Sequence, residues 1–411
     1  MEPQSLSSSP RGSVLGSALL IAGCCIGAAM LGLPVLTALA GFEPSLVMFV
    51  CSWLFMMTSG FLLLEVNLWF GDRAGIVTMA ERTLGPIGKG FSWFLFLFLF
   101  YSIMVAYVVG SGSLIAMMGQ ELLGLTLTPW MGSLICVLLF GVLIYSGTTG
   151  VDYFNRFLMF GLITSYLGLV FMGFEHVETQ NLKHVDWSQA WYVIPPMIIS
   201  FGFHNMIPSV SYYLGTDQPK RLVRAIFLGS AIPLVIYLIW EYIILGIIPV
   251  EGEGGFRQAL QQGDMATQAL RSAVGSAWVV TLAEYFGFFA IVTSLLSVAL
   301  SFVDFLADGL KVQRDHKGRA LLCALTLVPP YLVGITYPTV FLTALNYAGA
   351  FGANILFGII PALMVWKGRY KFGWKAKRLV PGGRFVLSLI IAFAMAVVFL
   401  QLAREIGWLQ P

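Results

Sequence analysis

Two segments combine glycine, proline and polar side chains inside long apolar runs, which indicates broken helices. The first extends from Ala22 to Pro34 and the second from Pro195 to Ser209. Glycine weakens a helix and proline removes a backbone donor, so amide and carbonyl groups lose their helical partners at such places. Freed amides can bind an anionic group, and freed carbonyls can bind a cation. The predicted chemistry is therefore ligand and ion binding, with no covalent step.

A stripe of small and hydroxyl-bearing residues lies in a later apolar run. Its members share one helix face by their spacing and are Ala290, Thr293, Ser294, Ser297 and Ser301. Two hydroxyl oxygens beside carbonyls freed by the first break would suit a weakly held hard cation such as sodium. Close helix packing against small residues is the alternative, and the stripe alone favours neither.

Four ionisable side chains within apolar runs are further candidates, because charge is costly in a bilayer and a functional role is the default hypothesis there. They are Glu65, Glu241, Glu284 and His204. Each carboxyl group is a candidate for ion coupling, although Glu241 would also fit as a protonated structural residue. In the second broken segment, the His204 imidazole could bind substrate or relay a proton. A neutral structural histidine is the alternative.

The composition places these segments in a polytopic membrane protein. Of 411 residues, 58% are hydrophobic and 10% are charged, whereas a soluble domain carries about 25% charged residues. A net charge of +3 without a basic face speaks against a nucleic-acid partner. No cofactor or metal is expected, and the apolar runs hold no His/Glu motif of an intramembrane enzyme. No metal-binding spacing occurs among the cysteines, which are Cys24, Cys25, Cys51, Cys136 and Cys323.

Eleven apolar runs are long enough to cross a bilayer, which takes about 20 helical residues. Their approximate ranges are 14–39, 43–70, 91–119, 130–147, 156–174, 191–214, 223–248, 276–303, 319–336, 340–366 and 385–404. Of the 23 Lys and Arg residues, 19 fall on the side of the N-terminus. Cytoplasmic loops collect such residues, so we expect the N-terminus inside and the C-terminus outside. We also expect a short amphipathic helix in the outer connection 249–277, and interpret 367–384 as an anchor on anionic lipid.

The two broken segments occupy matching places among these spans. Spans 1 and 6 each begin a set of five, and because five is odd, the second set enters the membrane from the opposite side. Helix packing would explain either break alone, but breaks at matching positions of inverted repeats are typical of a transporter binding site. We predict an all-α protein whose parts are a cytoplasmic tail (1–13), two five-helix repeats (14–174 and 191–366) and an eleventh helix (385–404).

Several motifs along the chain resemble one known family. They are Leu15-Gly16-Ser17, Ile26-Gly27-Ala28, Leu64-Glu65-Val66, Asn155-Arg156-Phe157, Ser200-Phe201-Gly202-Phe203-His204, Val303-Asp304-Phe305 and Tyr347-Ala348-Gly349. They look like motifs of the bacterial tyrosine- and tryptophan-specific permeases, in the hydroxy and aromatic amino acid permease family. This resemblance implies a LeuT-like 5+5 inverted-repeat core with eleven helices. It also implies uptake of aromatic amino acids across the bacterial inner membrane, generally driven by protons.

The resemblance also implies roles for individual residues. The substrate's carboxylate and ammonium would be held by Ala22, Gly23, Cys24, Cys25, Gly27, Ala28 and Ala29, with Ser200, Phe201, Gly202, Phe203 and His204 opposite. Similarity to sodium-coupled members of the wider fold would place an ion among Gly23, Ile26, Ala290, Thr293 and Ser294. The chain departs from the family pattern at Cys24-Cys25, where threonines are expected, at Ala29 and at Glu241, and these changes bear on substrate choice.

We therefore expect a symporter that imports tyrosine, or else tryptophan or phenylalanine, together with protons. The alternatives are sodium coupling, a serine or threonine substrate, and an amino-acid-binding sensor or channel. A sensor or channel would give no accumulation above equilibrium.

Overall fold

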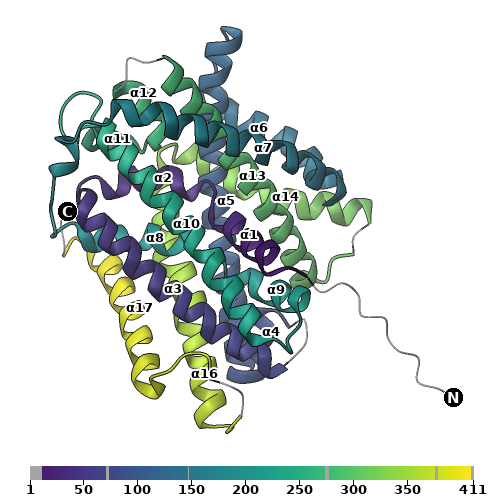
Figure 1. Ribbon diagram of the computed structural model, residues 1–411. Coiled ribbons are helices and arrows are strands. Elements are labelled where there is room, and N and C mark those ends of the chain that lie inside the picture. The colour runs from purple at the N-terminus through teal and green to yellow at the C-terminus, as the bar shows by residue number, and fades with distance from the viewer. Residues whose placement is uncertain are drawn as a thin grey trace.

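The protein is an all-helical bundle in the part of the chain that the computed structural model describes (Figure 1). That part comprises residues 12–70, 74–146, 148–273, 277–313, 315–374 and 378–408. Most of the predicted N-terminal tail lies outside it. Ten of its helices are long and apolar enough to cross a membrane, and a bent pair supplies an eleventh span. The predicted helical class and the predicted number of spans are confirmed.

The spans agree with the predicted ranges to within a few residues at most ends. They are α1 (Val14–Cys25) with α2 (Ala29–Thr37), α3 (Phe42–Phe70), α5 (Pro86–Leu123), α6 (Pro129–Ser146), α7 (Thr148–Gly173), α8 (Ile194–Ser200) with α9 (Ile207–Leu214), α10 (Pro219–Ile247), α13 (Ala277–Leu310), α14 (His316–Thr336), α15 (Val340–Tyr347) with the π-helical η5 (Ala348–Ile359) and α16 (Ile360–Tyr370), and α17 (Gly383–Glu405).

Short helices lie at both ends of the bundle. One end carries α4 (Ile76–Leu84), which the apolar runs did not reveal, and the other carries α11 (Phe256–Gln262) and α12 (Ala266–Ala273). The connection 249–277 thus holds two short helices instead of the single one expected. Figure 1 shows α4 and α16 at one end, which we call the basic end, and α11 and α12 at the α11–α12 end. Four 3-10 turns complete the described elements and are η1 (Phe174–His176), η2 (Asn181–Lys183), η3 (Ala190–Val193) and η4 (His204–Met206).

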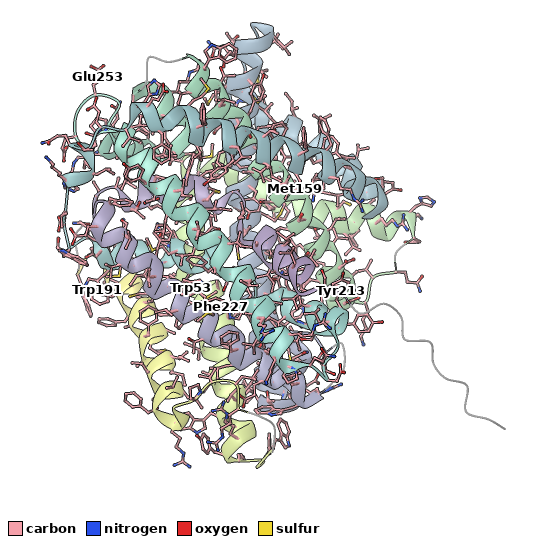
Figure 2. All side chains as sticks on the ribbon, in the orientation of Figure 1. Trp53, Met159, Trp191, Tyr213, Phe227 and Glu253 are labelled. Carbon is pink, nitrogen blue, oxygen red and sulfur yellow. The ribbon has the colours of Figure 1, made fainter. Side chains whose placement is uncertain are left out.

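The broken first span packs closely against helix α10. A Cβ atom at Gly229 would lie 2.6 Å from Ile21 Cβ, so the absence of a side chain lets α1 and α10 approach closely. On another face of α10, the Trp53 indole of α3 donates to Ser230 Oγ at 3.1 Å and packs edge-on against Phe227 (Figure 2). Helices α1, α3 and α10 therefore form one packed unit beside the breaks.

Side chains from neighbouring helices replace hydrogen bonds that two prolines remove. Pro34 cannot donate to the Met30 carbonyl, and the Trp240 indole of α10 donates to that oxygen at 2.9 Å. In α14, the carbonyl freed by Pro329 belongs to Leu325 and accepts from the Tyr101 hydroxyl of α5 at 3.0 Å. Unpaired backbone groups are costly inside a bilayer. These donors therefore allow both prolines to remain within spans.

Candidate functional site

The first span is broken in the middle, and α13 packs against the break. Helix α1 ends at Cys25 and α2 begins at Ala29, with a bend of 58° between them. The Ala28 amide donates to Ser294 Oγ of α13 at 3.3 Å. A Cβ atom at Gly27 would lie 2.1 Å from the same oxygen, so the approach of α13 requires glycine there.

The sixth span is broken at the same depth and faces the first break. Helix α8 ends at Ser200, and α9 begins at Ile207 after the η4 turn. The Cys24 thiol lies 3.6 Å from Asn205 Oδ1, which accepts its hydrogen bond. Residues of the two breaks that are far apart in sequence thus come together.

A single hydroxyl group on α10 links the two breaks. The Tyr237 Oη atom lies 2.6 Å from the Cys25 carbonyl oxygen and 2.9 Å from the Ser200 carbonyl oxygen. These are the last residues of α1 and α8, where carbonyl groups lack helical donors. Tyr237 has one proton to donate, so the two acceptors share it.

Tyr237→Phe is expected to lower the free energy of unfolding by about 1–3 kcal/mol, because two buried carbonyl groups lose their donor. Thermal unfolding in detergent measures the change. Tyr337→Phe is the matched control, since Tyr337 is 63% exposed. Equal melting temperatures for both variants would contradict a structural role of the Tyr237 hydroxyl.

Helix α5 supplies a further hydroxyl group to the space between the breaks. The Tyr107 side chain lies close to Ser294 and Cys24. On α13, Thr293 Oγ1 donates to the Phe289 carbonyl at 2.7 Å, so its proton stays on its own helix. Tyr107, Cys24, Asn205 and Ser294 therefore surround one region at mid-depth, contributed by α5, both broken spans and α13.

This region is exposed on the side that faces the basic end. Exposed polar residues continue from the breaks toward that end on α9 and α13 and include Asn205, Ser209, Ser297 and Ser301. Gly23 and Cys24 are exposed as well. In the other direction α2 is buried from Ala29 to Val35 and is covered by α11, α12 and α15. The structure is therefore open toward the basic end and closed toward the α11–α12 end.

The aromatic residues of the second break pack away from the first. Phe201 packs edge-on against Phe49 of α3 and contacts Tyr237, and a Cβ atom at Gly60 would lie 2.8 Å from the Phe203 ring. The His204 ring stacks on Phe357 and bonds through Nε2 to Ser59 Oγ at 2.8 Å. His204 is fully buried among these groups, whereas the adjacent Asn205 faces Cys24.

Glu65 and Glu284 both have basic partners. Arg369 of α16 donates to both Glu65 oxygens, at 2.7 and 2.6 Å, and the pair is buried. Glu284 accepts from Arg271 of α12 at 3.2 Å and is also hydrogen-bonded to Glu121. Each of these carboxyl groups joins two helices, and neither lies among the residues that meet at the breaks. Their roles in ion coupling stay predictions.

Glu241 differs because none of its contacts in the described residues is with a cation. It is fully buried, its Oε1 atom hydrogen-bonds to the Thr37 hydroxyl at the end of α2, and its Oε2 atom has no partner there. Thr37 Oγ1 also lies 2.9 Å from the Leu33 carbonyl oxygen, which can only accept. The Thr37 hydroxyl has one proton, and both this carbonyl oxygen and Glu241 Oε1 can accept it.

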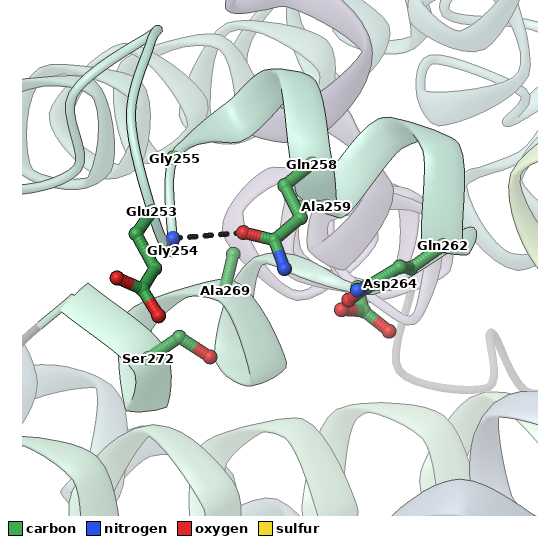
Figure 3. A pocket seen from close by; sticks show the side chains of 9 residues that line it. All are labelled: Glu253, Gly254, Gly255, Gln258, Ala259, Gln262, Asp264, Ala269 and Ser272. Atoms are coloured by element: carbon green, nitrogen blue, oxygen red, sulfur yellow. Dashed lines mark hydrogen bonds between the residues drawn. The ribbon is translucent and has the colours of Figure 1, made fainter.

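A separate polar pocket of about 400 Å³ opens at the α11–α12 end (Figure 3). Its lining includes Glu253 and Asp264, and the Gly254 amide donates to Gln258 Oε1 at 2.9 Å. Burial raises the pKa of Asp264. The pocket lies between the short helices that cover α2, outside the region where the breaks meet.

Known proteins match nearly the whole chain in sequence. The sequence profile of the tryptophan/tyrosine permease family matches residues 11–401. The chain belongs to the tryptophan/tyrosine permease family. This family consists of permeases rather than enzymes.

Individual relatives and one solved structure extend the comparison. The tyrosine-specific transport system 2 of Haemophilus influenzae is 32% identical, covering 97% of this chain and 98% of the relative. The tryptophan-specific transport protein of the same organism is 30% identical, covering 96% and 97%. The crystal structure of MhsT in complex with L-phenylalanine superimposes with a TM-score of 0.68 over 95% of this permease and 100% of that chain, at 15% identity. The permease therefore has the LeuT-like fold.

Three polar side chains at the breaks were absent from the candidate residues predicted from sequence. They are Tyr107, Asn205 and Tyr237. Tyr107 and Tyr237 carry hydroxyl groups within apolar spans at the depth of the breaks, and a search for such groups would have found them. Asn205 follows His204 directly, and only the local backbone decides which of the two faces Cys24.

Proposed function

We propose that this permease is a symporter for an aromatic amino acid, with tyrosine as its main substrate and the proton as its coupling ion. The observation that carries the proposal is the meeting of two broken spans around Cys24 and Asn205. Half-helix ends there offer amide and carbonyl groups to an amino acid's charged ends. The names of the relatives and the phenylalanine bound to MhsT support the aromatic class.

The substrate's carboxylate would bind at the N-terminus of α2, where the helix dipole favours negative charge. The Tyr107 hydroxyl lies beside this position and would donate to the same carboxylate. The ammonium group would bind the carbonyl oxygens at the end of α8 and Asn205 Oδ1. The aromatic ring would then lie along α13 toward Phe286, which packs against Trp240 with ring centroids 5.0 Å apart.

We propose that the basic end is cytoplasmic, as the distribution of Lys and Arg favours. The described structure would then be an inward-open state that releases substrate into the cell. Residues 14–174 and 191–366 would form the two repeats whose relative motion exchanges this state for an outward-open one.

Uptake of labelled L-tyrosine by proteoliposomes tests the function. One set carries an inward proton gradient without sodium, and a second carries an inward sodium gradient at equal pH. Accumulation with protons alone supports the proposal, and accumulation only with sodium would move coupling to Thr293 and Ser294. Accumulation with neither gradient would overturn the symporter. Competition by unlabelled phenylalanine, tryptophan, serine and threonine then ranks the substrates.

A further inference from the structure

Helix α16 contacts both α4 and α17 at the basic end, and a cavity lies between the three helices. The cavity has a volume of about 450 Å³ and is lined by Leu84, Leu363, Trp366, Lys367, Tyr370, Lys371 and Arg384. Three of these residues are basic, four are apolar or aromatic, and none is acidic. The cavity therefore offers positive charge over an apolar floor.

Aromatic rings position two of the three cations. The Arg384 guanidinium lies over the Tyr370 ring at 4.7 Å, and Lys367 Nζ lies over the Phe372 ring at 5.7 Å. Among the described residues, none of Lys367, Lys371 and Arg384 forms an ion pair. By contrast, Arg369 in the same segment is buried against Glu65. The three lining cations are thus available to an anionic ligand.

The depth of the cavity identifies the kind of anion. The α16 span ends at Tyr370 and the α17 span begins at Gly383, so the cavity lies where both helices leave the apolar zone. Leu363, Phe385 and Leu389 are exposed on the same two helices, deeper in the membrane. A ligand with an anionic head and acyl chains fits here, because its head would contact the basic cavity and its chains would contact the apolar residues deeper in the membrane. Basic pockets between spans at the cytoplasmic surface bind such lipids.

We propose that this cavity is a binding site for an anionic glycerophospholipid. The phosphate binds Lys367, Lys371 and Arg384, and the acyl chains lie against the exposed apolar residues of α16 and α17. A pocket at the α11–α12 end also contains two arginines, Arg257 and Arg404, but Asp186 lines it as well. A third pocket, lined in part by Lys220, Arg224 and Arg378, has no acidic residue either, but it has no aromatic lining residue. The cavity between α4, α16 and α17 combines three cations with the aromatic residues Trp366 and Tyr370 and has no acidic residue in its lining.

Native mass spectrometry of the full-length protein with added phosphatidylglycerol or phosphatidylcholine of equal acyl chains tests the site. The wild type is expected to retain phosphatidylglycerol preferentially. The variant Lys367→Gln/Lys371→Gln/Arg384→Gln is expected to bind it at least about tenfold more weakly, because each basic side chain near an anionic lipid contributes attraction. The charge-conserving variant Lys367→Arg/Arg384→Lys should keep most of the binding.

Matched controls separate this site from general surface charge. Lys311→Gln/Lys317→Gln removes two other cations at the same end, one directly after α13 and one in the first turn of α14, and should leave lipid retention unchanged. Unchanged retention in the triple variant would overturn the proposal. Equal losses in the control would overturn it too. Displacement of the lipid by sn-glycerol 3-phosphate alone would show an anion site without a lipid requirement, and would also overturn it.

Discussion

Gly27→Leu is expected to reduce L-tyrosine binding more than about 100-fold, a loss of about 2.7 kcal/mol, and so to abolish measurable uptake. The reason is steric. A Cβ atom added at position 27 would lie 2.1 Å from Ser294 Oγ, and the rest of a leucine side chain would occupy the space in which the substrate is proposed to bind. Binding by scintillation proximity and uptake in proteoliposomes measure the effect.

Two further variants separate a blocked site from a misfolded protein. Gly90→Leu places the same side chain on α5, where no atom lies within 4 Å of the added Cβ, and should transport normally. Gly27→Ala conflicts mainly with the Ser294 hydroxyl, because Ser294 Cβ is 3.3 Å from the added atom. Gly27→Ala/Ser294→Ala should therefore bind better than Gly27→Ala alone, which is the pattern of coupled neighbours. Normal uptake by a folded Gly27→Leu variant would place the substrate elsewhere.

Glu241→Gln is expected to end accumulation while leaving exchange of labelled for unlabelled substrate. Glutamine keeps the shape of the carboxyl group beside Thr37 but can neither take up nor release a proton. One proton carried per substrate across a difference of one pH unit supports about tenfold accumulation. The accumulation ratio of Glu241→Gln should therefore fall to about 1 under that gradient. Parallel assays of counterflow and gradient-driven uptake give both quantities.

Glu284→Gln is the matched carboxyl variant, since Glu284 also lies within a span and hydrogen-bonds to another side chain. We expect it to keep gradient-driven accumulation. If instead Glu284→Gln loses accumulation and Glu241→Gln keeps it, coupling passes through the carboxyl groups beside α12 and not through α2. Loss of exchange in Glu241→Gln would indicate a structural role.

The sequence was sufficient for the spans and for both breaks, because bilayer thickness and helix-breaking residues leave strong local patterns. The contact of Gly27 with Ser294 was not predicted, because the stripe of small and hydroxyl residues on α13 did not decide between ion binding and helix packing. Side-chain direction within the second break did not follow from the sequence either. The backbone turns His204 toward Ser59 and Asn205 toward Cys24, and this choice depends on a 3-10 turn that apolar periodicity does not encode.

Carboxyl groups within spans were equally difficult to assign from sequence. Glu65 and Glu241 both interrupt apolar runs. Glu65 pairs with Arg369, which is 304 residues away in sequence, whereas Glu241 hydrogen-bonds to the Thr37 hydroxyl. Partners at such sequence separations depend on the tertiary arrangement. Short helices such as α4 were missed because nine mixed residues resemble a loop in a search for long apolar runs.

Trp240 and Tyr101 donate to carbonyl groups that prolines leave without a helical donor, and these contacts limit which substitutions the chain can accept during evolution. If Trp240 changed to a residue without a donor while position 34 stayed proline, the buried Met30 carbonyl would have neither a helical donor nor the indole donor. A buried polar group without a partner costs about 1–3 kcal/mol. Pro34 and Trp240 are therefore expected to covary among homologues, as are Pro329 and Tyr101, although the members of each pair lie on different helices.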